Sequence, residues 1–136
     1  MPNKRQRISD DMDLFIEHCK GIDEWPDSWE IDEGDIKIGH DIVAQFKPFI
    51  ISLIEKKLSK KTIKIYKNYL WALGGELIRQ INEDESERLL SARELILKHI
   101  YGGGGPYWRH ASDEQDRSKY NSVCTKLFGF MTEKLG

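Results

Sequence analysis

The segment LSKKTIKIYKNYLWALGGELIRQ, residues Leu58 to Gln80, sets the architecture of this chain. Its apolar side chains recur every three or four residues, which is the period of an α-helix with one buried face. Ser59 is a good N-cap for this pattern, so the sequence predicts a helix from Ser59 to about Asn82. At about 100° per residue, six apolar side chains share one sector and form its core stripe: Ile63, Tyr66, Leu70, Leu73, Leu77 and Ile81.

Lysines gather on a second face at the start of the same helix. Lys60, Lys64 and Lys67 cluster there, with Trp71 one turn further along and Lys61 at the flank. Lysines are unfavourable for helix stability at this place, because a helix N-terminus already carries partial positive charge. Together with the free backbone N–H groups of the first turn, they would form a phosphate site. The alternative is a solvated charged face without a partner.

Gly74 and Gly75 interrupt the second half of this helix. Each glycine costs up to about 1 kcal/mol relative to alanine at such a position. We expect another helix to approach closely here, with a direct ligand contact as the alternative.

Helical patterns continue on both sides of this segment. Pro48 suits the first turn of a preceding helix that ends near Leu58, and Ser86 is a candidate N-cap for a following helix. Ser112 and Gln115 have the spacing of a capping box before the last helix. Its expected apolar stripe is Tyr120, Val123, Cys124, Leu127, Phe128 and Met131.

These patterns predict an all-α fold, a bundle of four to five helices with a loosely structured N-terminal arm. Residues 1–8 are expected to be a disordered basic tail, residues 9–40 an acidic arm and residues 41–136 the helical bundle domain. A flexible break is expected at Gly102–Gly105, before the last helix.

The arm has a short helical pattern and then an irregular one. Ser9 is a candidate N-cap and Gly21 a candidate C-terminal cap for the short helix. Between Asp23 and Gly39, apolar and polar residues alternate around a glycine, which predicts either a short hairpin or an extended loop.

Charge is distributed unevenly along the 136 residues, although the formal net charge is only −2. Residues 1–35 contain 4 basic and 11 acidic side chains, a net charge of −7. Residues 45–80 contain 8 basic and 2 acidic side chains, a net charge of +6. Such a chain can present a basic face to phosphate while its total charge stays acidic. The acidic arm could also fold back onto that face.

Several classes of protein are disfavoured. No apolar run approaches the roughly 18–20 residues of a membrane span, and the basic N-terminus lacks the apolar core of a signal peptide, so a cytoplasmic location is expected. Cys19 and Cys124 fit reduced, small hydrophobic residues. The glycine run lacks the Gly-Lys-Ser/Thr ending of a phosphate loop. The four histidines have no metal-ligand spacing, and we expect no metal, no cofactor and no enzymatic activity.

One family resemblance covers about Ile42 to Leu77. The residues that carry it are Phe49, Ile50, Leu53, Lys57, Leu58, Ser59, Thr62, Ile63, Tyr66 and Leu70. This pattern resembles the N-terminal core-binding domain of tyrosine recombinases (phage integrases). The resemblance implies a small SAM-like orthogonal helical bundle that holds double-stranded DNA. The longer segment also resembles a group of bacterial proteins of similar length with no assigned function.

The resemblance implies DNA contacts at Lys60, Lys61, Thr62, Lys64 and Lys67, and the basic face adds Trp71. The catalytic domain of that family, with its nucleophilic tyrosine, has no counterpart in this sequence, and the acidic total charge also departs from the family. The expected function is therefore a small, non-catalytic DNA-binding or DNA-associated module. The alternative is a protein-interaction or regulatory module, similar to an antitoxin, whose contact would be the acidic arm with Trp25, Trp29 and Trp108.

Overall fold

The computed structural model describes residues 13–101 and 104–133. All regular elements in these two ranges are helical, which confirms the predicted all-α class. The predicted basic tail, the candidate cap Ser9 and the first half of the predicted glycine break lie outside the described residues.

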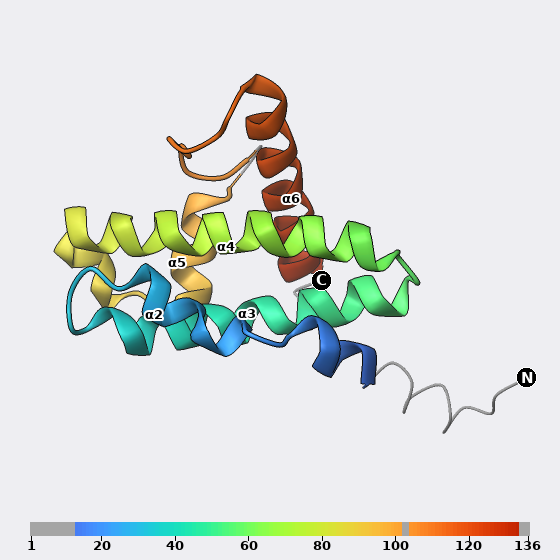
Figure 1. Ribbon diagram of the computed structural model, residues 1–136. Coiled ribbons are helices and arrows are strands. Elements are labelled where there is room, and N and C mark those ends of the chain that lie inside the picture. The colour runs from blue at the N-terminus through green and yellow to red at the C-terminus, as the bar shows by residue number, and fades with distance from the viewer. Residues whose placement is uncertain (1–12, 102–103, 134–136) are drawn as a thin grey trace, which may run out of the picture.

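Two long helices form the base of the bundle. Helix α3 (Asp35–Glu55) and helix α4 (Lys60–Glu83) lie antiparallel, side by side, and are joined by a short turn. Figure 1 shows helices α5 (Ala92–His99) and α6 (Glu114–Glu133) crossing this pair steeply, so the bundle is orthogonal. The predicted cap of α4 is confirmed, since Ser59 Oγ accepts a hydrogen bond from Thr62 N at 3.1 Å.

The core lies where α3, α4, α5 and α6 meet, and it contains the stripes that the helical period predicts. On α4, Tyr66 is partly buried and the other five predicted positions are fully buried. On α6, Phe128 is partly buried and its five companions are buried. Helical periodicity therefore locates the buried faces of both long amphipathic helices.

The expected hairpin or extended loop between Asp23 and Gly39 is wrong. The structure has a 3₁₀ turn, η1 (Ile22–Glu24), then helix α2 (Trp25–Trp29), and α3 already begins at Asp35. The physical reason is burial: Ile22 and Trp29 belong to the hydrophobic core, with 0% and 5% of their surface exposed. Pro26 in the first turn favours a helix at this place.

Pro48 lies inside α3 and not in the first turn of a helix as expected. The helix extends upstream because Ile42, Val43 and Phe46 bury an apolar face there. Pro48 has no backbone N–H, so the carbonyl of Ala44, four residues earlier, lacks its helical hydrogen bond. Both residues are exposed, which places this carbonyl on the solvent side of the helix.

Two predicted caps are also wrong. Ser91, not Ser86, caps α5 through a complete capping box with Glu94. The Ser86 hydroxyl donates to Asp84 instead, within the 3₁₀ helix η2 (Glu85–Leu89). At the start of α6, the backbone N–H of Asp116 donates to Asp113 Oδ1 at 2.7 Å, so an aspartate takes the role predicted for Ser112.

A buried carboxylate joins the start of α3 to two distant segments. Asp35 is fully buried and accepts hydrogen bonds from the backbone N–H groups of Ile31 (2.9 Å) and Asp32 (2.8 Å). Asn82 Nδ2 donates to the same carboxylate at 3.0 Å, and Arg88 Nη1 lies 2.9 Å from its second oxygen. This cluster fixes the connection between α2 and α3 against the end of α4 and against η2.

Candidate nucleic-acid interface

The arm contacts one side of the predicted DNA-binding face of α4. Lys60 Nζ lies 3.1 Å from Glu17 Oε1, and Trp71 Nε1 donates to Ser28 Oγ at 3.0 Å. Lys67, which lies between these two contacts along the helix, is only partly exposed. Three of the six predicted contact residues therefore face the arm.

Lys67 is a poor candidate for a phosphate contact. Burial lowers the pKa of its ammonium group, and the neighbouring charge of Lys64 lowers it further. Close to it, burial raises the pKa of the Cys19 thiol to about 11, so this thiol stays protonated at neutral pH. The surroundings of Lys67 thus disfavour charge.

Exposed lysines, Lys60 among them, form a surface at the turn between α3 and α4. We call Lys56, Lys60, Lys61 and Lys64 the lysine edge; all four are exposed. Among the described residues, no carboxylate pairs with Lys61 or Lys64. The Thr62 hydroxyl accepts a hydrogen bond from Ser59 at 2.9 Å, so its first role is in the helix cap.

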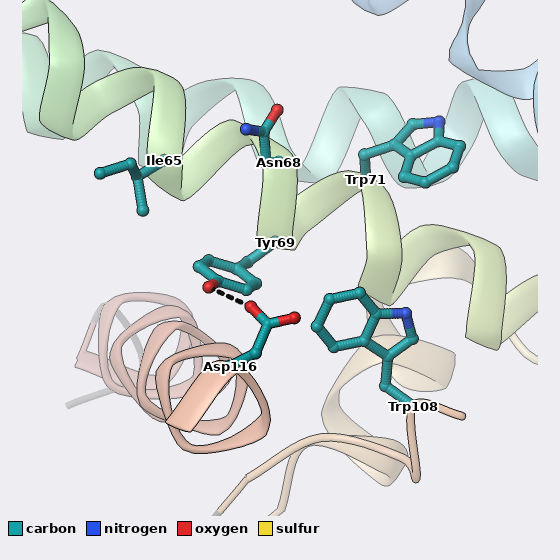
Figure 2. A pocket seen from close by; sticks show the side chains of 6 residues that line it. All are labelled: Ile65, Asn68, Tyr69, Trp71, Trp108 and Asp116. Atoms are coloured by element: carbon teal, nitrogen blue, oxygen red, sulfur yellow. Dashed lines mark hydrogen bonds between the residues drawn. The ribbon is translucent and has the colours of Figure 1, made fainter. Parts of the chain in front are cut away.

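Next to the lysine edge, α4, α6 and the segment before α6 border an open aromatic groove of about 380 Å³ (Figure 2). It is lined by Ile65, Asn68, Tyr69, Trp71, Trp108 and Asp116. Trp71 and Ile65, which lie on its wall, are 44% and 42% exposed. Large exposed apolar side chains that gather in one hollow mark a binding surface.

The walls of the aromatic groove are held in place. Tyr69 donates its hydroxyl proton to Asp116 Oδ1 at 2.6 Å, as the dashed line in Figure 2 shows. Trp108 packs edge-on against Tyr69, with ring centroids 5.9 Å apart, and also against Tyr120 at 5.2 Å. The hydrogen bond to Ser28 fixes the ring of Trp71. These contacts preorganise the aromatic rings before any ligand binds.

A second hollow of about 280 Å³ continues from the aromatic groove and shares Trp71 and Trp108 with it. Arg79 and His110 are among the residues that line it. Glu76 is buried there; burial raises its pKa, and Arg79 Nε, 3.7 Å from Oε2, opposes part of that shift.

Trp25 and Trp29 of the arm are not exposed on the surface, as they would be if they formed the contact with a protein partner. Trp29 is buried and Trp25 is half-buried against it, with ring centroids 5.9 Å apart. Trp29 Nε1 donates to the backbone carbonyl of Trp71 at 3.0 Å. The expected close approach at the glycine pair is confirmed, because the ring of Trp29 occupies the place where a side chain at Gly74 would stand.

Sequence reasoning missed that Tyr69, Trp108 and Asp116 meet. One signal was present: Ile65 and Tyr69 are four residues apart, and neither belongs to the core stripe of α4. A second apolar pair on an otherwise polar face indicates a second contact surface. The partners Trp108 and Asp116 have no such signal, since they come from the segment before α6 and from its first turn.

Within the described ranges, no three His, Cys, Asp or Glu side chains are arranged to hold a metal ion. None of the helices in these ranges is long and apolar enough to span a membrane. No family model matches the chain, and no curated protein or solved structure matches it either. The SAM-like subclass and the relation to recombinases therefore stay predictions.

Proposed function

We propose that this chain is a small, non-catalytic DNA-binding module that holds duplex phosphates with its lysine edge. The observation that carries the proposal is the exposure of Lys61 and Lys64 beside the N-terminus of α4. Two cationic side chains and the positive end of the helix dipole there act on the same anion. The resemblance to the recombinase core-binding domain supports the same face of α4.

Lys60 can join this surface because its pairing with Glu17 is weak. The two side chains are 67% and 58% exposed, and ion pairs in such surroundings contribute little. Phosphate can compete with Glu17 for this lysine. Lys67 and Trp71 are left out of the proposed duplex contacts, because the arm lies against them.

The test is fluorescence anisotropy with a labelled mixed-sequence duplex at about 50 and 200 mM salt. Wild-type binding should weaken steeply between these concentrations, because each phosphate contact adds about 0.9 to the salt slope. The double variant Lys61→Glu/Lys64→Glu should bind at least about tenfold more weakly, with a salt slope smaller by about 2. Lys37→Glu reverses an exposed lysine on α3 as the matched control and should change little. Salt-independent binding, or none at the lower salt, would contradict the proposal.

A protein partner for the acidic arm is the second candidate. Its supporting observation is a row of exposed carboxylates on and after α2: Asp27, Glu30, Asp32 and Glu33. Such a row suits a basic protein surface. Charge reversal of this row should abolish binding of a basic partner protein, whereas duplex affinity should not fall.

A further inference from the structure

We infer that the aromatic groove binds an unpaired base of a single-stranded nucleic acid whose phosphates lie on Lys61 and Lys64. The inference rests on the proposed function, because the lysine edge supplies the phosphate contacts. It goes further, since holding a duplex backbone requires no exposed aromatic ring, whereas single strands are held by stacking their bases on such rings.

The first step is the position of the rings. Figure 2 shows Trp71 on one side of the groove and Trp108 on the other, with Tyr69 next to Trp108. The contacts to Ser28, Asp116 and Tyr120 hold these rings, so binding a base costs little side-chain ordering. The volume of about 380 Å³ falls in the range of about 300–1,000 Å³ that small-molecule sites occupy.

The second step is the order of charge along α4. Lys61 lies one turn before Ile65, and Lys64 lies one turn before Asn68, so cations border the aromatic groove at its first end. Arg79 lies in the continuing hollow, fifteen positions after Lys64, or about 22 Å along the helix. Lysines before the aromatic rings, with Arg79 beyond them beside Glu76, match a strand that alternates phosphates and bases.

The third step is the polar lining. Asn68 is exposed and offers both donors and an acceptor to the edge of a base. The hydrogen bond from Tyr69 lowers the pKa of Asp116, with a further contribution from the backbone N–H of Ser112, so this carboxylate is ionised at neutral pH. It attracts the amino groups of bases and repels phosphate. The groove thus accepts the base and leaves the phosphates at the lysines.

The test compares one labelled DNA sequence of about 12 nucleotides as a single strand and as a duplex, with RNA of the same sequence as a third probe. Trp71→Ala should lower affinity for the single strand about tenfold, which corresponds to about 1.4 kcal/mol and lies within the range for loss of one stacked base. Duplex affinity should change less than about twofold. Trp71→Phe should recover most of the loss, since it restores an aromatic ring.

Ser28→Ala separates the ring from its support, because it removes the hydrogen bond to Trp71 and keeps the ring. It should lower single-strand affinity less than about threefold. Single-strand binding that Trp71→Ala leaves unchanged would overturn the inference while the proposed duplex binding stands. An equal loss for single strand and duplex would also overturn it, as it would show a general structural effect.

The remaining outcomes separate the two proposals. Binding of the single strand that depends on Trp71, with no binding of the duplex, would support the groove and overturn the proposed duplex function. Absence of binding to all three probes would overturn both. Equal dependence of RNA and DNA binding on Trp71 would show that the groove recognises the base and not the sugar.

Discussion

Asp35 shows how a single side chain can hold a fold together from inside. An ionised carboxylate is costly to bury without partners, but here four donors from three segments surround it. Burial alone would raise the pKa of Asp35. The hydrogen bonds from Asp32, Asn82, Ile31 and Arg88 outweigh it and lower this pKa below the usual value.

Asp35→Asn should lower the free energy of unfolding by about 3 kcal/mol at pH 7, because Arg88 would lose its buried carboxylate partner and keep only the exposed Glu85 as a counter-charge. The pKa of Asp35 is lower in the folded protein than the ordinary value of 3.8, which applies to the unfolded chain. The ionised carboxylate therefore stabilises the fold fully above pH 3.8, and this stabilisation is lost as the pH falls through the pKa of the folded protein. The gap between wild type and variant should therefore shrink below about pH 4. Urea denaturation at pH 7 and pH 3 measures this difference in the free energy of unfolding, with Asp41→Asn at an exposed position as the control. A difference that does not depend on pH would contradict this account.

Gly74 and Gly75 are adjacent but should respond in opposite ways to alanine. A Cβ at Gly74 would overlap the ring of Trp29, so Gly74→Ala should cost about 1–3 kcal/mol. A Cβ at Gly75 would lie 3.4 Å from the same ring, at ordinary contact distance, and alanine favours the helix by up to about 1 kcal/mol. Thermal unfolding of both variants checks the prediction; similar shifts of Tm would contradict it.

Among the elements, α4 and α6 were predictable from sequence, whereas the start of α3 and the structure of the arm were not. Helices α4 and α6 repeat their apolar side chains over 24 and 20 residues, long enough for the helical period to identify the buried face. Helix α2 has only 5 residues and no measurable period. Its position follows from the burial of Ile22 and Trp29 against α3 and α4, a tertiary effect that local patterns do not contain.

The caps of the shorter helices offer a direct test of the corrected boundaries. Ser91→Ala should destabilise the protein by about 1 kcal/mol, because it removes the acceptor for the backbone N–H of Glu94. Ser86→Ala should cost less than about 0.5 kcal/mol, since Asp84 caps η2 and would keep its bond to the backbone N–H of residue 86. Chemical denaturation of both variants distinguishes them. A larger cost for Ser86→Ala would place the cap where the sequence pattern predicted it.

For the molecule as a whole, the arm is part of the fold and also borders the lysine edge. Lys61 and Lys64 could be identified from the sequence because exposure on a polar helical face is a local property. The partial burial of Lys67 and the contact of the arm with Trp71 could not, because Ser28 and Trp71 are 43 positions apart in the chain. Removing residues 1–38 would take Ile22, Trp29 and Asp35 from the core, so that truncation should unfold the protein.

A milder change tests whether the arm competes with DNA. Glu17→Ala should raise duplex affinity about two- to fivefold by releasing Lys60, in keeping with the small free energy of exposed ion pairs. Asp23→Ala is the matched control, because Asp23 pairs with Lys47 on α3, outside the lysine edge. Anisotropy with the same duplex measures both. An equal rise for the two variants would show a general effect of net charge.

The contact between Trp29 and Gly74 also has a consequence for the history of this sequence. The indole ring fits only because position 74 has no side chain, so neither residue can change size alone without loss of packing. Related sequences should therefore vary at these two positions together: a side chain at position 74 should accompany a smaller residue at position 29. Such paired substitution would identify homologous chains in which the arm still docks on α4, even where the lysines differ.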